Sequence, residues 1–298
     1  MPTDDMPAGA IPMVDGLEAI ADRYDGFIVD LWGTVHNGQT PLPGAIACLE
    51  HLRADGKPVL ILSNAPRRAE PIIERMRALG IPDEIYDAVF SSGEAAYLAL
   101  RDRPDSFHAG LDRKCFLLGP PEDDSTIAGL DYEIVESIRA AHFILAVGSF
   151  RRTDTVADYD GLLGAANDRH LPMVCANPDL EVIRGDAREI CAGAIAERYA
   201  RAGGAVHFHG KPHKPIYEAS LALLGRDPGA SVLAIGDSFG TDIAGANAAG
   251  LDSLMITGGI HAQKLGVEPF DLPEPGRLAA LAAQYGARPT AAAAAFRW

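Results

Sequence analysis

Short runs of apolar residues alternate with longer amphipathic segments along most of the chain. Residues 26–31 (GFIVDL) and 58–64 (PVLILSN) have the length and composition of buried strands. Each is followed by a segment whose apolar residues recur at helical spacing, and these two segments end at Gly56 and Gly80. This alternation predicts βαβ units and a parallel sheet.

The pattern changes near residue 103, where a looser segment begins, and the first rhythm returns at AVHFHG. Between these points a second α/β alternation occurs. We therefore predict a doubly wound parallel-sheet α/β core formed by residues 1–95 and 206–298, with a smaller α/β domain inserted at 96–205. The C-terminal stretch TAAAAAFRW is predicted to be a terminal helix that packs its Phe and Trp.

Composition indicates a globular protein with a full core. The chain has 298 residues, of which 48% are apolar and 22% charged. A net charge of −15 argues against a nucleic-acid partner but allows a small phosphorylated ligand. No apolar run is long enough to span a membrane, and the N-terminal residues lack a signal-peptide pattern. Four cysteines without metal-binding spacing are expected to be free thiols in a reducing cytoplasm.

Polar side chains follow several of the predicted strands. Because the carboxyl ends of parallel strands meet at one edge of a sheet, these side chains are expected to converge there. A strand-end Asp is often only a helix cap, and Ser-Asn is often only a turn, but this ordered set favours a shared site. The set comprises Asp30, Ser63, Asn64, Lys211, Asp237 and Asp242.

The chemistry of this set is consistent with phosphoryl transfer. Asp30, Asp237 and Asp242 supply hard carboxylate oxygens, which suit Mg²⁺. One oxygen of Asp30 would attack phosphorus and form an aspartyl phosphate. Ser63 and Asn64 would bind the phosphoryl oxygens, and Lys211 would neutralise negative charge. Neither a dinucleotide-binding glycine pattern nor a P-loop occurs in the sequence.

The ordered motifs resemble those of the haloacid dehalogenase superfamily of phosphohydrolases. Asp30 followed by Gly33-Thr34, then LSNAPR, GKP and GDSFGTDIAGANAAG, stand in the family's order. The insert between the SN and GKP motifs, with its CANPDLE and CAGAIAERYA stretches, is similar to the type-2 cap of the class IIA branch, which includes p-nitrophenylphosphatases and sugar and nucleotide phosphatases. The resemblance implies a Mg²⁺-dependent hydrolase acting on a small phosphorylated metabolite, phosphate contacts at Gly33 and Thr34, and a homodimer formed through the cap.

Trp32 departs from the family pattern. The resemblance places a second Asp two residues after the nucleophile Asp30, where it protonates the leaving group and then activates water. The Trp32 side chain can do neither, although its main-chain carbonyl can still bind Mg²⁺. General acid–base help is worth ~10²–10⁴ in rate, so we expect turnover of phosphates with poor leaving groups to suffer most. His36 is a candidate replacement acid, with an exposed loop histidine as the alternative.

Other functions remain open at this stage. Without the water-activating Asp, the protein could be a slow or non-catalytic phosphate-binding or regulatory protein. Dehalogenases and phosphonate hydrolases of the superfamily also lack the second Asp, but Asp237 argues against the former. Phosphonate hydrolases use a lysine from a helical cap. The insert is predicted to be α/β instead and its only lysine is Lys114, which argues against this class.

Three histidines near the GKP motif suggest another alternative. His207 and His209 alternate along a predicted strand and would share a face, and His213 follows them. A transition-metal site is one interpretation, opposed by the position of Lys211 among them. The sequence does not identify the physiological substrate.

Overall fold

The computed structural model describes residues 10–298 except 122, 185, 186, 228 and 269. Residues 1–9, in which the sequence shows no signal-peptide pattern, lie outside this range. Among the described residues, helices are too short or too polar to cross a bilayer.

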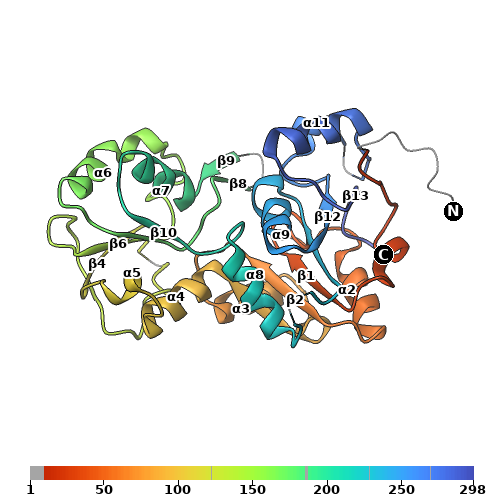
Figure 1. The fold of residues 1–298 in the computed structure, drawn as a ribbon, viewed down its shortest axis with the longest axis horizontal. Helices are drawn as coiled ribbons and strands as arrows, with labels where there is room; N and C mark the ends of the chain where they lie inside the picture. The colour runs from red at the N-terminus through yellow and green to blue at the C-terminus, as the bar shows by residue number, and fades with distance from the viewer. Residues whose placement is uncertain (1–9, 122, 185–186, 228, 269) are drawn as a thin grey trace. The chain divides into compact units, whose positions relative to one another are not determined.

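The chain forms two compact units. The first comprises Met1–Leu62, Met76–Val89 and Tyr217–Trp298, and the second comprises Ser63–Arg75 and Phe90–Ile216. The first unit is therefore built from both ends of the chain, as its red-to-orange and blue segments show (Figure 1). The predicted domain boundaries at residues 95/96 and 205/206 stay a prediction.

A six-stranded parallel sheet contains the strands of the first unit. Its strand runs are buried along nearly their whole length, as expected for a parallel sheet covered by helices. The spatial order is β13 (Ala291–Ala293), β12 (Asp252–Ile256), β11 (Val232–Gly236), β1 (Gly26–Asp30), β2 (Val59–Ser63) and β3 (Ala88–Ser91).

This order places a topological switch point between β1 and β11. Counted along the chain, the six strands have the order 3-2-1-4-5-6 of doubly wound nucleotide-binding folds, so the prediction of a doubly wound core is confirmed. Val29 of β1 lies opposite Ile235 of β11. Ligands bind in such sheets at the carboxyl ends of the strands beside the switch point, where Asp30 and Asp237 lie.

Short helices and turns connect these strands. They are α1 (Glu18–Ala21), α2 (Ala45–Ala54), the 3₁₀ turn η1 (Asp83–Ile85), the π-helical turn η3 (Phe239–Ile243), α9 (Ala244–Ala249), α10 (Ala262–Leu265) and α11 (Pro275–Tyr285). The helices α3 (Ala69–Ala78) and α8 (Lys214–Leu223) include the chain positions at which the units meet.

The prediction of a C-terminal helix is wrong. Residues 291–293 form the edge strand β13, whose Ala291 pairs with Leu254 of β12. A nine-residue alanine-rich segment is too short to be stable as a helix alone, and strand pairing overrides its propensity. The predicted packing of the aromatic residues is present, since Phe296 is buried and Trp298 stacks on His51 with ring centroids 4.9 Å apart.

The second unit contains its own five-stranded parallel sheet and a two-stranded antiparallel hairpin. The five strands are β10 (Val206–Phe208), β7 (Met173–Cys175), β6 (Phe143–Ala146), β4 (Lys114–Leu118) and β5 (Glu133–Ile134), and the hairpin is β8 (Glu181–Arg184) with β9 (Ala187–Ile190). The helical elements are α4 (Ser92–Asp102), α5 (Ser106–Ala109), η2 (Val156–Tyr159), α6 (Asp160–Asn167) and α7 (Ala192–Arg201).

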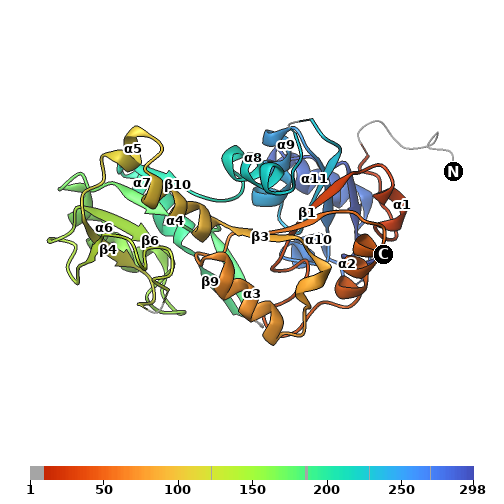
Figure 2. The same ribbon diagram turned by 90° about the horizontal axis from the view of Figure 1, so that it is seen from below.

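Alternating side chains of this sheet enter two hydrophobic clusters. Ile144 and Met173 pack with Leu163 of α6 and Ile195 of α7 on one face. The other face packs against α4 and α5, so helices lie on both sides of the sheet (Figure 1). Figure 2 shows β3 running directly into α4, whose first turn is capped by the Ser91 hydroxyl.

Candidate active site

The predicted site residues fall into two groups, one in each unit. In the first unit, Asp30 ends β1, Asp237 follows β11 directly, and Asp242 lies on the π-helical turn η3. All three are buried, and one carboxylate oxygen from each lies within 4.8 Å of the others. Bringing three carboxylates together in a buried position raises their mutual repulsion, which a bound cation would relieve.

Backbone groups orient two of these carboxylates. The Asp237 Oδ2 accepts a hydrogen bond from the Ile260 N–H at 2.7 Å, and the Asp242 Oδ2 accepts one from the Ser238 N–H at 3.1 Å. Glycines make room for both. A Cβ at Gly33 would lie 2.1 Å from the Asp237 Oδ2, so a side chain at Gly33 would displace the carboxylate.

Gly33 and Thr34 form the turn after β1. Gly33 has φ +87°, which favours glycine for a second reason. Thr34 is fully buried, and within the described part of the chain its hydroxyl has no hydrogen-bond partner. A buried hydroxyl without a partner costs about 1–3 kcal/mol, so this atom is a candidate contact for a bound ligand.

Trp32 packs against the same turn. Its ring meets the His36 ring edge-on with centroids 5.4 Å apart, and a Cβ at Gly38 would lie 2.2 Å from the indole. His36 is 3% exposed, so the alternative of an exposed loop histidine is wrong. Its Nδ1 accepts the Gly38 N–H at 2.9 Å, which leaves the ring proton on Nε2 when His36 is neutral.

The second group lies in the second unit, where Asn64 joins two distant parts of the chain. Its Oδ1 accepts the Lys211 N–H at 2.8 Å, and its Nδ2 donates to the Lys211 carbonyl at 3.0 Å. The Nδ2 also donates to the Asp179 Oδ1 at 2.7 Å. The Asn64 side chain therefore holds the backbone of Lys211 in place, and Lys211 itself is 3% exposed.

Close backbone approaches explain two glycines near this group. Gly210 has φ +116°, and a Cβ there would lie 2.5 Å from the Asn64 Oδ1. A Cβ at Gly193, at the start of α7, would lie 2.3 Å from the Pro178 carbonyl oxygen. The ANPD stretch, residues 176–179, therefore packs closely against the start of α7, and Asp179 in this stretch accepts the hydrogen bond from Asn64. Ser63, the last residue of β2, is buried, and its hydroxyl accepts the Ala65 N–H.

Comparisons with known proteins identify the family of this chain. Family profiles described as haloacid dehalogenase-like hydrolase and HAD-hydrolase-like match residues 27–133 and 208–280. A crystal structure of a haloacid dehalogenase-like hydrolase from Brucella suis is 34% identical, covers 95% of this chain and 100% of its own, and has a TM-score of 0.80. The chain belongs to the haloacid dehalogenase-like hydrolases.

Two further relatives share less sequence with the chain. Bovine chronophin is 28% identical over 83% of this chain and 85% of its own length. The glycerol phosphate phosphatase of Mycobacterium tuberculosis, solved in complex with magnesium, is 24% identical, covers 87% of this chain and 78% of its own, and has a TM-score of 0.63, which bears on the fold alone. The predicted superfamily, its class IIA branch and the core-plus-cap fold are confirmed.

The three carboxylates fit the divalent cation that the haloacid dehalogenase family implies. Each donor is a hard oxygen, as Mg²⁺ requires, and the cluster is small enough for one ion. Among the described residues this cluster consists of carboxylates alone, and the four cysteines are buried free thiols. Burial raises the pKa of Cys115 and of Cys175 to about 12, so both thiols are protonated at neutral pH.

The structure changes the predicted histidine cluster. His207 and His209 lie together as predicted, but the third member is His108, whose ligand atom is within 4.8 Å of theirs. His213 instead stacks on Phe208. Sequence reasoning missed His108 because it lies about a hundred residues earlier in the chain. The Asp105-x-x-His108 spacing is typical of a helix cap and carries no information about a partner for His207.

Proposed function

We propose that the protein is a Mg²⁺-dependent phosphohydrolase that acts on a small phosphorylated metabolite through an aspartyl phosphate on Asp30. The observation that carries this proposal is the buried cluster of Asp30, Asp237 and Asp242 at the switch point of the sheet. These three side chains, with the main-chain carbonyl of Trp32, would hold Mg²⁺. The ion would offset the charge of the phosphate and of the carboxylates. Four buried reduced thiols support a cytoplasmic location.

The reaction has two steps on Asp30. In the first, a carboxylate oxygen of Asp30 bonds to phosphorus while the bond from phosphorus to the leaving oxygen breaks. In the second, water attacks phosphorus, the bond between phosphorus and Asp30 breaks, and phosphate leaves with the carboxylate restored. The first step requires a proton for the leaving oxygen, and the second releases one from water.

The second unit supplies a group suited to the phosphoryl oxygens. We assign phosphate binding to the Ser63 hydroxyl and to Lys211, whose backbone Asn64 holds through two hydrogen bonds. Since both side-chain ends of Asn64 are engaged, its contribution to phosphate binding would come through its own N–H and through Lys211. In the first unit, we assign phosphate binding to Gly33 and Thr34, with the Thr34 hydroxyl donating to a phosphoryl oxygen.

Trp32 determines which phosphates are turned over. Its indole carries no acid that can donate to a leaving oxygen, and it packs on the turn at Gly38. We therefore expect efficient turnover of aryl and acyl phosphates, whose leaving groups need little protonation. Sugar and alkyl phosphates would react slowly unless His36 supplies the proton from Nε2.

Trp32 also favours a second candidate function. In it, Asp30 becomes phosphorylated and the phosphoryl group is hydrolysed from Asp30 only slowly. Without a residue that activates water, the aspartyl phosphate would live longer. This protein would report or hold a phosphorylated ligand rather than process it. A hydroxylamine-sensitive phosphoprotein that persists for minutes would support this candidate, and rapid multiple turnover would exclude it.

The test is phosphate release from p-nitrophenyl phosphate, acetyl phosphate and a panel of sugar and nucleotide phosphates. The proposal predicts release that requires Mg²⁺ and is lost in Asp30→Asn, with the highest rates for the first two substrates. Equal release by wild type and Asp30→Asn would contradict it. Robust sugar-phosphate turnover would instead identify another proton donor, with His36→Asn as the first variant to measure.

A further inference from the structure

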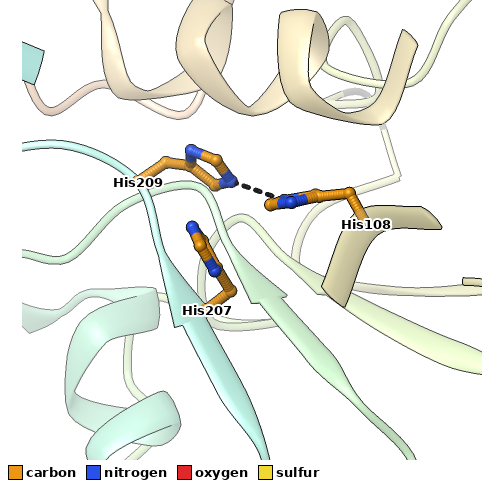
Figure 3. A group of neighbouring side chains, drawn as sticks. All are labelled: His108, His207 and His209. Carbon is orange, nitrogen blue, oxygen red and sulfur yellow. Dashed lines mark hydrogen bonds between the residues drawn. The ribbon is translucent and has the colours of Figure 1, made fainter. Parts of the chain in front are cut away.

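Three imidazole rings converge inside the second unit, on residues that the proposed hydrolysis does not use. His207 and His209 come from β10 and the residue after it, and His108 comes from α5 (Figure 3). The Nε2 atoms of His108 and His209 are 3.1 Å apart. The His207 ring centroid lies 4.5 Å from that of His108 and 4.8 Å from that of His209.

A carboxylate orients the fully buried member of this group. Asp105 caps α5 by accepting the His108 N–H at 2.9 Å, and it also accepts from the His108 Nδ1 at 2.8 Å. The Nδ1 proton of His108 is thereby fixed, so its Nε2 presents a lone pair toward the other rings. A carboxylate behind a histidine is the arrangement that metal-binding proteins use to set the tautomer and orientation of a ligand.

The spacing of the rings matches a tetrahedral cation. Zinc–nitrogen bonds of about 2.0–2.1 Å at tetrahedral angles place two ligand nitrogens about 3.3 Å apart, close to the 3.1 Å between the His108 and His209 Nε2 atoms. The third ligand atom is within 4.8 Å of both. It therefore needs to approach by at most about 1.5 Å, and in the proposed site the partly exposed His207 ring would supply this movement.

We propose that His108, His207 and His209 bind one transition-metal cation of the zinc class, with water in the fourth position. Three neutral imidazoles favour Zn²⁺, Co²⁺, Ni²⁺ or Cu²⁺ over Mg²⁺, which prefers oxygen. Without the cation, one of the two Nε2 atoms in the His108–His209 contact must carry the shared proton. Since His108 carries its proton on Nδ1, the donor is His209, and cation binding moves that proton to the His209 Nδ1, so that the ring stays neutral.

Two of the three rings, His207 and His209, lie in surroundings that disfavour the charged imidazolium. Burial, reinforced by the neighbouring imidazoles His207 and His108, lowers the pKa of His209 to about 3. Burial and the neighbouring His108 likewise lower the pKa of His207. The cation would join α5 to β10, two elements about a hundred residues apart, and so stabilise the second unit. It would also hold the strand that leads to Lys211.

The experiment is a Zn²⁺ titration of the full-length protein, prepared without a polyhistidine tag and stripped of metal. Saturating Mg²⁺ is present throughout to occupy the carboxylate cluster. The site predicts one equivalent of Zn²⁺ by calorimetry and a Co²⁺ visible spectrum typical of tetrahedral nitrogen ligation. His207→Asn should weaken Zn²⁺ binding by roughly 100-fold or more, and Asp105→Asn, which removes only the orienting carboxylate, by about 10–100-fold.

Two control variants locate the cation. His213→Asn, on the same stretch of chain but stacked on Phe208, should bind Zn²⁺ within about threefold of wild type. Asp237→Asn should also leave Zn²⁺ affinity unchanged. Binding below one equivalent, equal affinity in wild type and in both His207→Asn and Asp105→Asn, or loss of binding in Asp237→Asn would overturn the proposal. Because Asp105 is exposed on the protein surface, its variant remains informative if His207→Asn does not fold.

Discussion

Replacing Trp32 by Asp restores a carboxyl group at the position from which the proposed mechanism lacks a proton donor. General acid–base catalysis contributes about 10²–10⁴ in rate, or about 3–5 kcal/mol of barrier. We expect kcat/KM for sugar phosphates to rise by this factor. For p-nitrophenyl phosphate the change should stay within about tenfold, since a nitrophenolate leaves without a proton.

The substitution also removes packing from the turn after β1. The indole covers Gly38 and the edge of His36, and Trp32 is only partly buried. The loss of stability should be about 1–3 kcal/mol, below the 3–5 kcal/mol typical of a fully buried Trp. Thermal unfolding of the variant should therefore occur at a lower temperature but remain cooperative.

The assay compares steady-state kcat/KM of wild type, Trp32→Asp and Trp32→Asn on a sugar phosphate and on p-nitrophenyl phosphate. Trp32→Asn matches Asp in size but cannot donate a proton as an acid. The reasoning is refuted if Trp32→Asn accelerates sugar-phosphate turnover as much as Trp32→Asp does. It is also refuted if both substrates gain equally, because the effect would then not depend on the leaving group.

Three further substitutions test the second unit. Asn64→Ala leaves the backbone N–H and carbonyl of Lys211 without their partner. It should lower the free energy of unfolding by about 2–4 kcal/mol, measured by denaturant unfolding, and it should lower kcat for phosphate release. An unchanged kcat would contradict the positioning role of Asn64. Gly210→Ala should cost at least about 2 kcal/mol, because φ is +116° and the new Cβ would lie 2.5 Å from the Asn64 Oδ1. The matched control Gly161→Ala, in open space on α6, should instead stabilise by about 0.5–1 kcal/mol, and similar unfolding midpoints for the two would refute the steric argument. Ser91→Ala removes the cap of α4 and a hydrogen bond to a backbone carbonyl, so a loss of about 2 kcal/mol is expected, and a melting temperature within 1–2 °C of wild type would count against it.

The sequence carries strong information where burial and motif coincide. The strands ending at Asp30 and Ser63 are fully apolar before their last residue, and both occur as predicted. The meeting of Asp30 with Asp237 follows from the rule that parallel strands end at one edge of a sheet.

Tertiary packing decides the features that the sequence did not reveal. The alanine-rich tail looks helical by propensity, but it pairs with β12 because the sheet edge offers it hydrogen bonds that an isolated nine-residue helix lacks. The hairpin of β8 and β9 and the helix α11 were not predicted from the sequence. His108 joins His207 only through folding of the cap, which no local spacing encodes.

The role of Asn64 shows the same limit at a single residue. A Ser-Asn pair after a strand indicates a phosphate site, and this interpretation treats both side chains as ligands. In the structure the Asn64 side-chain amide instead hydrogen-bonds the backbone of Lys211, which lies 147 positions later in the chain. The sequence pattern predicts which residues lie at the site. Their hydrogen-bond partners in the structure show what each side chain does there.

Direct detection of a phosphoryl group on Asp30 tests the central claim most closely. The protein is mixed with acetyl phosphate and Mg²⁺, quenched in acid within the first turnover, and digested for mass spectrometry. The account predicts one phosphoryl group on the peptide that contains Asp30, removed by hydroxylamine and absent from Asp30→Asn or without Mg²⁺. A phosphoryl group on another residue, or Mg²⁺-dependent phosphate release with no covalent species at any time, would contradict it.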